Sequence, residues 1–238
     1  RSPSRRADAR PNVPRVPIEF RLDGRSLGRA DTDERGIARF KTTAPEAGDH
    51  QVKAVYDGTK DLQRAEYTAL CVVRQAADPL LVVDVDWTLA MTDDLNTAAG
   101  GVDCPPLVGA PEGLTALAKS HTVVYVTSRA RQLRKRTISW LFRYGFPRGA
   151  SFYLDPSEYP TYDVVAYKTA LSKQLTASFS GIKIGIGNDA EDVAAYEAAG
   201  LRALAIGKHP IANAQSVPTW AEVEKAVSGA SVPAPKGP

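Results

Sequence analysis

The chain has 238 residues, of which 43% are hydrophobic and 24% are charged, and its formal net charge is +3. This is the composition of a globular protein with a substantial core, in one large domain or two small ones, and it excludes a chain that is disordered throughout. The small positive charge by itself favours no particular partner. No stretch approaches the roughly 18 consecutive apolar residues of a membrane span, which predicts a soluble chain.

The two ends of the chain differ in composition from the rest. Residues 1–13 contain several arginines and prolines and no apolar periodicity, which predicts a disordered basic arm that can touch an anionic surface. Residues 231–238 are expected to form a disordered tail. The first residue is Arg1, so a targeting signal upstream of it would not be visible.

Residues 14–76 consist of short runs in which apolar and polar residues alternate, separated by turn residues. This pattern predicts an antiparallel β-sandwich. The phrases TDERGIARF and GDHQVKAVY within it resemble bacterial immunoglobulin-like modules. The segment GRSLG at 24–28 matches G-x-S-x-G, but it lies in a β-hairpin pattern without the helix that a nucleophilic serine requires, so we set aside a serine hydrolase.

The cysteines and histidines show no recognisable site pattern. Cys71 and Cys104 lack C-x-x-C spacing and are interpreted as structural thiols, with a single disulfide left open as the alternative. His50, His121 and His209 show neither metal-site nor catalytic-triad spacing.

From residue 77 to 230, apolar strands alternate with stretches of helical spacing. The expected strands are LLVVD, TVVYVT, SFYL, IKIGIG and RALAIG, and the expected helices lie near residues 111–119, 130–144, 163–177, 190–199 and 219–228. Nearly continuous apolar strands between helices predict a parallel sheet covered on both faces, which is a doubly wound α/β domain. In such domains ligands bind at the carboxyl ends of the strands.

Polar residues follow three of these strands, and a lysine lies on a helix between them. They are Asp84, Asp86 and Thr88 after the first strand, Thr127, Ser128 and Arg129 after the second, Asn188, Asp189 and Asp192 after IKIGIG, and Lys168 on the intervening helix. If the strands are neighbours, these residues converge at one edge of the sheet. Two carboxylates as close as Asp84 and Asp86 are costly unless a cation neutralises them, and Mg²⁺ prefers oxygen ligands.

This set of residues suits phosphate chemistry. One carboxylate of the pair can attack phosphorus and form an aspartyl-phosphate, while the other delivers a proton to the leaving oxygen and later activates water. A threonine hydroxyl and a lysine ammonium can hold the phosphoryl oxygens and offset their growing charge.

The same residues resemble those of a known superfamily. DVDWT at 84–88, YVTSR at 125–129, Lys168 and GNDAED at 187–192 resemble, in their usual order, the four motifs of the haloacid-dehalogenase superfamily of Mg²⁺-dependent phosphatases. YVTSRA, TISWLF, FPRG, YKTAL and GNDAEDVAAYEAAGL resemble more closely the catalytic domain shared by lipin phosphatidate phosphatases and the lipin-related (LNS2-type) domain of phosphatidylinositol-transfer proteins. An immunoglobulin-like β-domain ahead of this domain is in keeping with lipins.

The resemblance implies a role for each motif residue. The implied catalytic roles are nucleophile for Asp84, general acid and base for Asp86, phosphate binding for Thr127, and positioning of the nucleophile and the phosphoryl group for Lys168. The implied ligands of Mg²⁺ are Asp84, the main-chain carbonyl of Asp86, and Asn188, with Asp192 as indirect support. Further candidates for substrate binding are Ser128, Arg129 and Trp87.

Two positions depart from the pattern of the wider superfamily. Asn188 stands where aspartate is commonest, although it resembles the lipin version, so Mg²⁺ would bind with one charge fewer. Trp87 stands where glycine is common, which changes the shape of the pocket entrance, since its side chain would point out beside the scissile phosphate. The spacing between the motifs leaves no room for a large cap domain. Members of the superfamily without caps usually act on substrates too large to enclose, such as membrane lipids, nucleic-acid ends or proteins.

The densest positive charge in the chain follows the second strand of this domain. It comprises Arg129, Arg131, Arg134, Lys135 and Arg136, with Arg143 and Arg148 beyond. A solvated helix face is one interpretation. The other is contact with an anionic membrane, where each basic residue contributes about 1 kcal/mol. The nearby Trp140, Leu141, Phe142 and Tyr144 are expected to pack in the core.

The sequence therefore predicts a Mg²⁺-dependent phosphomonoesterase that acts on phosphatidate or a related phospholipid, in the cytoplasm and at the periphery of a membrane. A polynucleotide end phosphatase is the alternative enzyme, because the basic helix would also suit a nucleic-acid backbone. A second alternative is a module that binds phosphatidate without cleaving it, although the presence of both Asp84 and Asp86 argues against it. A third is that the β-domain sets location by binding a protein or glycan.

Overall fold

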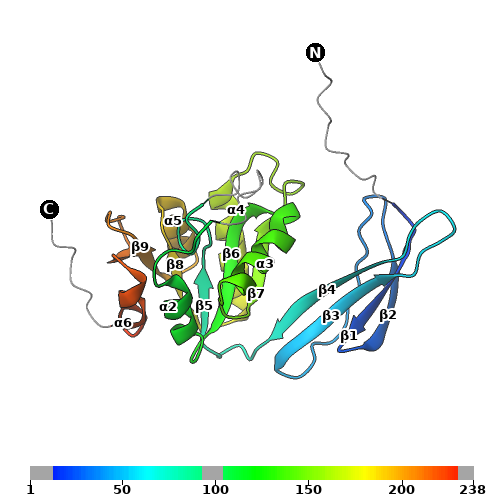
Figure 1. Ribbon diagram of the computed structural model, residues 1–238, viewed down its shortest axis with the longest axis horizontal. Helices are drawn as coiled ribbons and strands as arrows, with labels where there is room; N and C mark the ends of the chain where they lie inside the picture. Colours follow the sequence, from blue (N-terminus) through cyan, green and yellow to red (C-terminus); the bar gives the residue numbers. More distant parts are fainter. Residues whose placement is uncertain (1–12, 93–103, 230–238) are drawn as a thin grey trace, which may run out of the picture. The chain divides into compact units, whose positions relative to one another are not determined.

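The computed structural model describes residues 13–92 and 104–229, and the chain divides into two compact units, Arg1–Arg74 and Gln75–Pro238 (Figure 1). The basic arm up to residue 12 and the tail after residue 229 lie outside the described residues. In the described part of the chain, none of the helices has the length and hydropathy needed to cross a bilayer. Cys71 and Cys104 are both free thiols.

Unit 1 contains one antiparallel sheet with the strand order β2-β1-β3-β4. Its strands are β1 (Pro17–Leu22), β2 (Arg25–Asp31), β3 (Gly48–Tyr56) and β4 (Ala65–Val73). Asp23 and Gly24 join β1 to β2 and have φ values of 47° and 83°. Two-residue hairpin turns require this conformation, and Asp-Gly adopts it readily. The GRSLG segment thus belongs to a hairpin and not to a strand-to-helix turn.

The predicted β-sandwich of unit 1 is confirmed only in part. Its antiparallel strands are present, but the four strands described in residues 13–74 form a single sheet, so a second sheet and the immunoglobulin-like character are not confirmed. Phe40, in the segment between β2 and β3, stacks on Phe20 with ring centroids 5.6 Å apart. Its ring also fills the space over Gly28, where a Cβ would lie 2.8 Å from it. This segment therefore covers part of one face of the sheet.

Unit 2 is built on a parallel sheet with the strand order β10-β9-β8-β5-β6-β7. The strands are β5 (Leu80–Val83), β6 (Thr122–Ala130), β7 (Ala150–Leu154), β8 (Ile182–Gly187), β9 (Arg202–Ile206) and β10 (Gln215–Val217). The helices are α2 (Ala110–Leu117), η1 (Arg131–Leu133), α3 (Arg134–Arg143), α4 (Val164–Ser178), α5 (Ala190–Ala198), η2 (Trp220–Glu222) and α6 (Val223–Val227). Each predicted strand and helix is present; β10 is too short for its pattern to be recognised.

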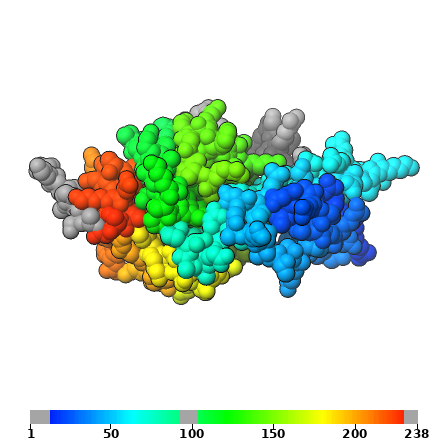
Figure 2. All heavy atoms as spheres, turned by 90° about the horizontal axis from the view of Figure 1, so that it is seen from below, coloured from blue at the N-terminus to red at the C-terminus, as the bar shows by residue number. Residues whose placement is uncertain are grey.

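Helices cover both faces of this sheet, as predicted for a doubly wound domain. Successive residues of β5 point to opposite faces: Leu81 and Val83 enter one apolar cluster, and Leu80 and Val82 enter the other. The first cluster includes side chains of α2, α3 and α6, and the second includes side chains of α4 and α5. In the space-filling view, α2 and α3 (green) lie on the opposite side of unit 2 from α4 and α5 (yellow to orange) (Figure 2).

The strand order places the three motif-bearing strands side by side, because β5 lies between β6 and β8. Helix α5 also approaches β8 closely, since Gly185 has no side chain and a Cβ there would lie 2.4 Å from the Tyr196 ring. Between β5 and α4 the described residues form α2, η1, α3 and strands of the core sheet, and they contain no cap domain. A ligand-binding site is therefore expected at the carboxyl edge of the sheet around β5.

Candidate active site

The segment after β5 is a tight turn that is fixed by backbone hydrogen bonds. The amide of Asp84 donates to Ile186 O at 2.9 Å and so continues the pairing of β5 with β8. The amides of Leu89 and Ala90 both donate to Val85 O, at 2.8 and 2.9 Å. The indole N–H of the buried Trp220 donates to Thr88 O at 2.7 Å. These bonds hold the carboxylates of the turn at the edge of the sheet.

Asp84 is buried, and its two oxygens have different partners. Lys168 Nζ donates to Asp84 Oδ1 at 2.8 Å. The Thr88 hydroxyl lies 3.1 Å from Asp84 Oδ2 and 3.0 Å from Asn188 Oδ1. A hydroxyl has a single proton to donate, so it satisfies only one of these two oxygens at a time. The pair Asp84 Oδ2 and Asn188 Oδ1 therefore has capacity for a further positive partner.

Lys168 also bridges Asp84 to a second buried carboxylate. Its Nζ donates to Asp192 Oδ1, and Asp192 Oδ2 accepts from the amide of Asn188 at 3.1 Å. The side chain of Asp189 accepts from the amide of Asp192 at 2.9 Å and caps the start of α5. Asp189 thus caps α5, and Asp192 positions Asn188 and Lys168 by accepting a hydrogen bond from each.

The charges of this cluster do not balance. Burial raises the pKa of Asp84 and of Asp192 above the ordinary carboxyl range, and the charge of Lys168 offsets only part of this rise. Burial lowers the pKa of Lys168, but the two carboxylates outweigh burial and hold that pKa above its ordinary value. One buried ammonium thus serves two buried carboxylates, which leaves the site short of positive charge.

These residues fit a bound Mg²⁺ ion. The atoms with spare acceptor capacity are oxygens, the cluster is short of positive charge, and Mg²⁺ takes oxygen ligands. Asp84 and Asn188 would hold the ion, with the main-chain carbonyl of Asp86 nearby in the chain. Within residues 13–92 and 104–229 no cluster of three or more His, Cys, Asp or Glu side chains is placed to hold a metal. The expected set is compatible with this, because it combines one carboxylate, one amide and a carbonyl.

Asp86 is held by Arg129, which corrects one prediction. Arg129 Nη2 donates to Asp86 Oδ1 at 2.7 Å, and its Nε lies 3.0 and 3.1 Å from the two carboxylate oxygens. Its Nη1 donates to the Thr137 hydroxyl at 3.1 Å. The residue is only 1% exposed. Arg129 is therefore not part of a membrane-facing basic surface, because its planar guanidinium pairs with a carboxylate in the interior.

Thr127 lies on the other side of the same carboxylate. Its hydroxyl is 3.3 Å from Asp86 Oδ2, and it also accepts from the amide of Arg129 at 3.2 Å. Strand β6 continues to Ala130, so Thr127 and Arg129 point to the same side of it, whereas the half-buried Ser128 points away. The sequence analysis did not identify Thr137 as a partner of Arg129. The only available signal was its position one helical turn into α3.

The other predicted surface residues are placed as follows. Arg131 is exposed and pairs with Asp155 at 3.1 Å, Lys135 and Arg136 are exposed, and Arg134 is half-buried. Trp140 and Leu141 are buried as expected. Phe142 is not, because it lies on the outer face of α3 with 84% of its surface exposed. Trp87 is half-exposed in the segment that follows β5.

A doubly wound parallel sheet that gathers Asp84, Asp86, Thr127, Lys168 and Asn188 at one edge has the arrangement expected from the haloacid-dehalogenase motifs. The family model described as "PITM 1-3, LNS2 domain" matches residues 81–206. This match spans more than half of the chain, so the chain belongs to the family that this model describes, the LNS2 domain of the PITM 1-3 proteins.

A search of the curated proteins found no significant match. Solved structures with some similarity include a D,D-heptose 1.7-bisphosphate phosphatase from B. bronchiseptica complexed with magnesium and phosphate, at 15% identity and a TM-score of 0.48 over 64% of this chain and 99% of that one. Another is a HAD-superfamily hydrolase from Geobacter sulfurreducens, at 15% identity and a TM-score of 0.46 over 63% and 100% of the two chains. A third, a chain of the Pnkp1/Rnl/Hen1 RNA repair complex, has 14% identity and a TM-score of 0.48 over 61% and 49%.

Proposed function

We propose that this protein is a Mg²⁺-dependent phosphomonoesterase that works through an aspartyl-phosphate and acts on phosphatidate or a related phospholipid. The observation that carries the proposal is the environment of Asp84. One of its oxygens is bound to Lys168, and the other lies with Asn188 around the Thr88 hydroxyl. Burial raises the pKa of this carboxyl, the charge of Lys168 opposes that rise, and the same partners fix its orientation, as a nucleophile requires.

The chemistry follows in two steps. An oxygen of Asp84 forms a bond to phosphorus while the bond from phosphorus to the leaving oxygen breaks, and Asp86 supplies the proton that the leaving oxygen takes up. Asp86 then accepts a proton from water, whose oxygen displaces Asp84 from phosphorus. Lys168 and Thr127 hold phosphoryl oxygens and keep the carboxylates in place. Bound Mg²⁺ would supply positive charge against the phosphoryl oxygens.

A phospholipid substrate is supported by the surroundings of the site. The described residues include no cap, and a headgroup on a bilayer is a substrate that cannot be enclosed. Arg131, Arg134, Lys135 and Arg136 follow the carboxyl end of β6, where they would face an anionic membrane. Membership of the LNS2 family agrees with this reading. We therefore propose a cytoplasmic protein that contacts membranes peripherally.

Phosphate release tests the substrate class. The protein is incubated with phosphatidate vesicles and, separately, with a 3′-phosphorylated oligonucleotide, each with and without Mg²⁺. We expect Mg²⁺-dependent release from the vesicles and little from the oligonucleotide. The reverse order would support a polynucleotide end phosphatase. Vesicle binding without release under any condition would replace the enzyme with a lipid-binding module.

Asp84→Asn tests the proposed nucleophile. An amide cannot form the acyl-phosphate, so turnover is expected to fall by about 10⁴-fold or more while the protein stays folded. Acid-quenched protein after incubation with a ³²P-labelled substrate should retain label in the native chain and not in the variant. Turnover by the variant close to the native rate would remove Asp84 from this role, provided circular dichroism shows both proteins equally folded.

A further inference from the structure

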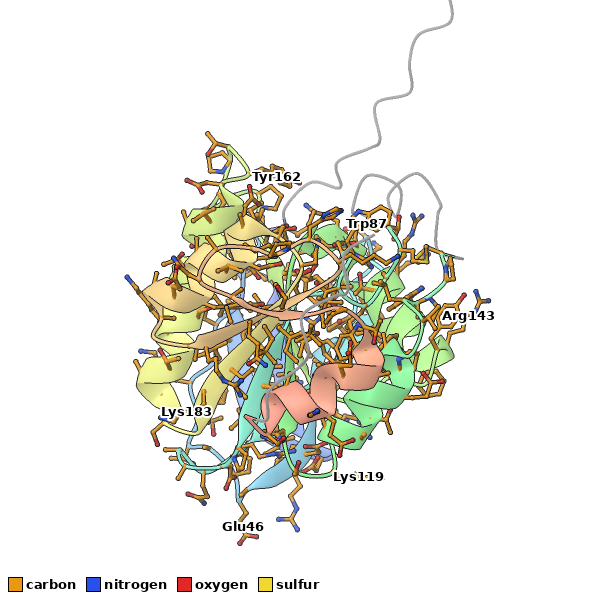
Figure 3. All side chains as sticks on the ribbon, turned by 90° about the vertical axis from the view of Figure 1, so that its left-hand side faces the viewer. Glu46, Trp87, Lys119, Arg143, Tyr162 and Lys183 are labelled. Carbon is orange, nitrogen blue, oxygen red and sulfur yellow. The ribbon has the colours of Figure 1, made fainter. Side chains whose placement is uncertain are left out.

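Three of the exposed large apolar side chains of unit 2 lie in segments that follow the carboxyl ends of core strands. Trp87 is 49% exposed, Met91 47% and Tyr162 44%. Trp87 and Met91 belong to the segment that follows β5, and Tyr162 lies between β7 and α4. Figure 3 shows Trp87 and Tyr162 at the same edge of unit 2, with Lys119 and Lys183 at the opposite edge. We call Trp87, Met91 and Tyr162 the apolar rim.

The two aromatic residues of the apolar rim have an unusual backbone. Trp87 has φ of 55° and Tyr162 has φ of 53°, in the left-handed region that bulky residues rarely adopt. Each is held there by a backbone hydrogen bond, from the Trp87 amide to Ala90 O at 2.8 Å and from the Tyr162 amide to Tyr159 O at 3.0 Å. Strained backbone of this kind is concentrated at functional sites. Because the exposed half of each ring contributes little to the core, contact with a partner outside the protein explains its position better.

The charge next to the apolar rim identifies the partner. The segment that starts where β6 ends, at the same edge of the sheet, carries Arg131, which pairs with Asp155, the half-buried Arg134, and the exposed Lys135 and Arg136. Tryptophan and tyrosine concentrate at the headgroup level of bilayers, and neighbouring cations attract anionic lipids. Met91 is aliphatic and has no ring to stack on a nucleobase. This combination favours a lipid surface over a nucleic acid.

We propose that the apolar rim enters the headgroup region of an anionic bilayer and so presents the active site to phosphomonoester headgroups in the plane of the membrane. The inference rests on the proposed function for its substrate, but its contact with lipid can be measured without turnover.

Tryptophan fluorescence of the unmodified protein tests the contact directly. The other two tryptophans, Trp140 and Trp220, are buried and donate to main-chain carbonyls, so Trp87 alone can respond to a surface. Vesicles of phosphatidate and phosphatidylcholine should shift the emission to shorter wavelength, and brominated acyl chains should quench it. Phosphatidylcholine alone should do neither. Co-sedimentation with the anionic vesicles without any change in emission would overturn the proposal.

Variants separate the rim from the chemistry. Met91→Gln combined with Tyr162→Asn removes apolar surface, and asparagine tolerates a left-handed backbone. Partition onto phosphatidate vesicles should fall by about tenfold, since the buried apolar area sets interfacial binding. Turnover of soluble p-nitrophenyl phosphate should not change. The matched control is Phe142→Gln, which removes an apolar ring that is 84% exposed on α3 outside the rim and should leave partition unaltered. Equal partition of the double variant and the native protein onto these vesicles would contradict the proposal. A loss of partition in Phe142→Gln as large as in the double variant would also contradict it.

The same measurements distinguish the two failures. Emission shifts and vesicle binding without phosphate release from any substrate would keep the apolar rim and discard the phosphatase. Release from soluble phosphomonoesters with no vesicle binding would keep the phosphatase and discard the rim.

Discussion

Arg129 shows how far charge pattern alone can mislead at the scale of one residue. In the sequence it is the first of a run of basic residues, and such a run predicts an exposed surface. In the structure it is buried against Asp86, which lies 43 positions earlier in the chain. A partner that distant is invisible to local pattern. Strand alternation gave no signal either, because the predicted strand ends at Thr127, whereas β6 continues to Ala130 with an irregular register after Thr127.

Most other site residues converge as their motifs predict. Asp84, Thr88, Lys168, Asn188 and Asp192 form one hydrogen-bonded cluster. The convergence could be predicted because the motifs follow the ends of parallel strands, and neighbouring parallel strands have their carboxyl ends at the same edge of the sheet. Their chemical roles stay predictions until they are measured.

Arg129→Ala should lower turnover of a soluble phosphomonoester by about 10²-fold, because Asp86 loses the fork that orients it. Arg129→Lys should recover only part of this rate, since an ammonium cannot reproduce two parallel bonds. Vesicle binding should be unaffected by either change. The exposed Arg136→Ala is the matched control and should show the reverse, with weaker vesicle binding and normal soluble turnover. Steady-state kinetics and co-sedimentation measure both, and a loss of vesicle binding in Arg129→Lys would return Arg129 to the surface role.

Lys168→Met should destabilise the protein by about 3–5 kcal/mol, because it leaves two buried carboxylates facing each other without a cation. Adding Asp192→Asn should recover part of that stability by removing one of the charges, while turnover stays lost. Urea unfolding of the three proteins in metal-free buffer measures the effect. Additive losses in the double variant would mean that Lys168 and Asp192 do not interact in solution.

At the scale of elements, periodicity predicts the strands and helices of unit 2 well and the architecture of unit 1 less well. Long apolar strands between helices leave few alternatives to a doubly wound sheet. The alternation in residues 14–76 shows that each strand has an apolar side, but not which residues cover it. In the structure, an irregular segment around Phe40 covers part of the sheet. Phe40 stacks on Phe20, and this contact cannot be predicted from a periodic pattern.

His50 should make the stability of unit 1 depend on pH. Its Nδ1 lies 2.7 Å from Asp23 Oδ2 and its Nε2 lies 2.8 Å from Glu46 O. Hydrogen bonding to Asp23 raises the pKa of His50 above its ordinary value of 6.5. A raised pKa in the folded state means that this contribution is complete below pH 6.5 and is lost as pH rises through the folded value. An NMR titration of the His50 ring gives that value, and His50→Gln should flatten the dependence; a ring titrating at or below 6.5 would contradict it.

At the scale of the whole molecule, the proposed chemistry lies in one unit. Both apolar core clusters and all the candidate catalytic residues belong to Gln75–Pro238. We expect a chain that begins at Gln75 to unfold cooperatively and to turn over soluble phosphomonoesters as the full chain does. Differential scanning calorimetry and phosphate release check this. A truncated chain that is folded but inactive would show that unit 1 contributes to the chemistry.

The hydrogen bond from the Trp220 indole to the main chain at Thr88 has a consequence for biosynthesis. The loop that carries both carboxylates is synthesised before Trp220, which follows Thr88 by 132 positions and supplies this hydrogen bond. A nascent chain on the ribosome should thus acquire a competent catalytic loop only after Trp220 has left the exit tunnel. Until then the growing polypeptide would carry the acidic motif without the support that keeps it in register.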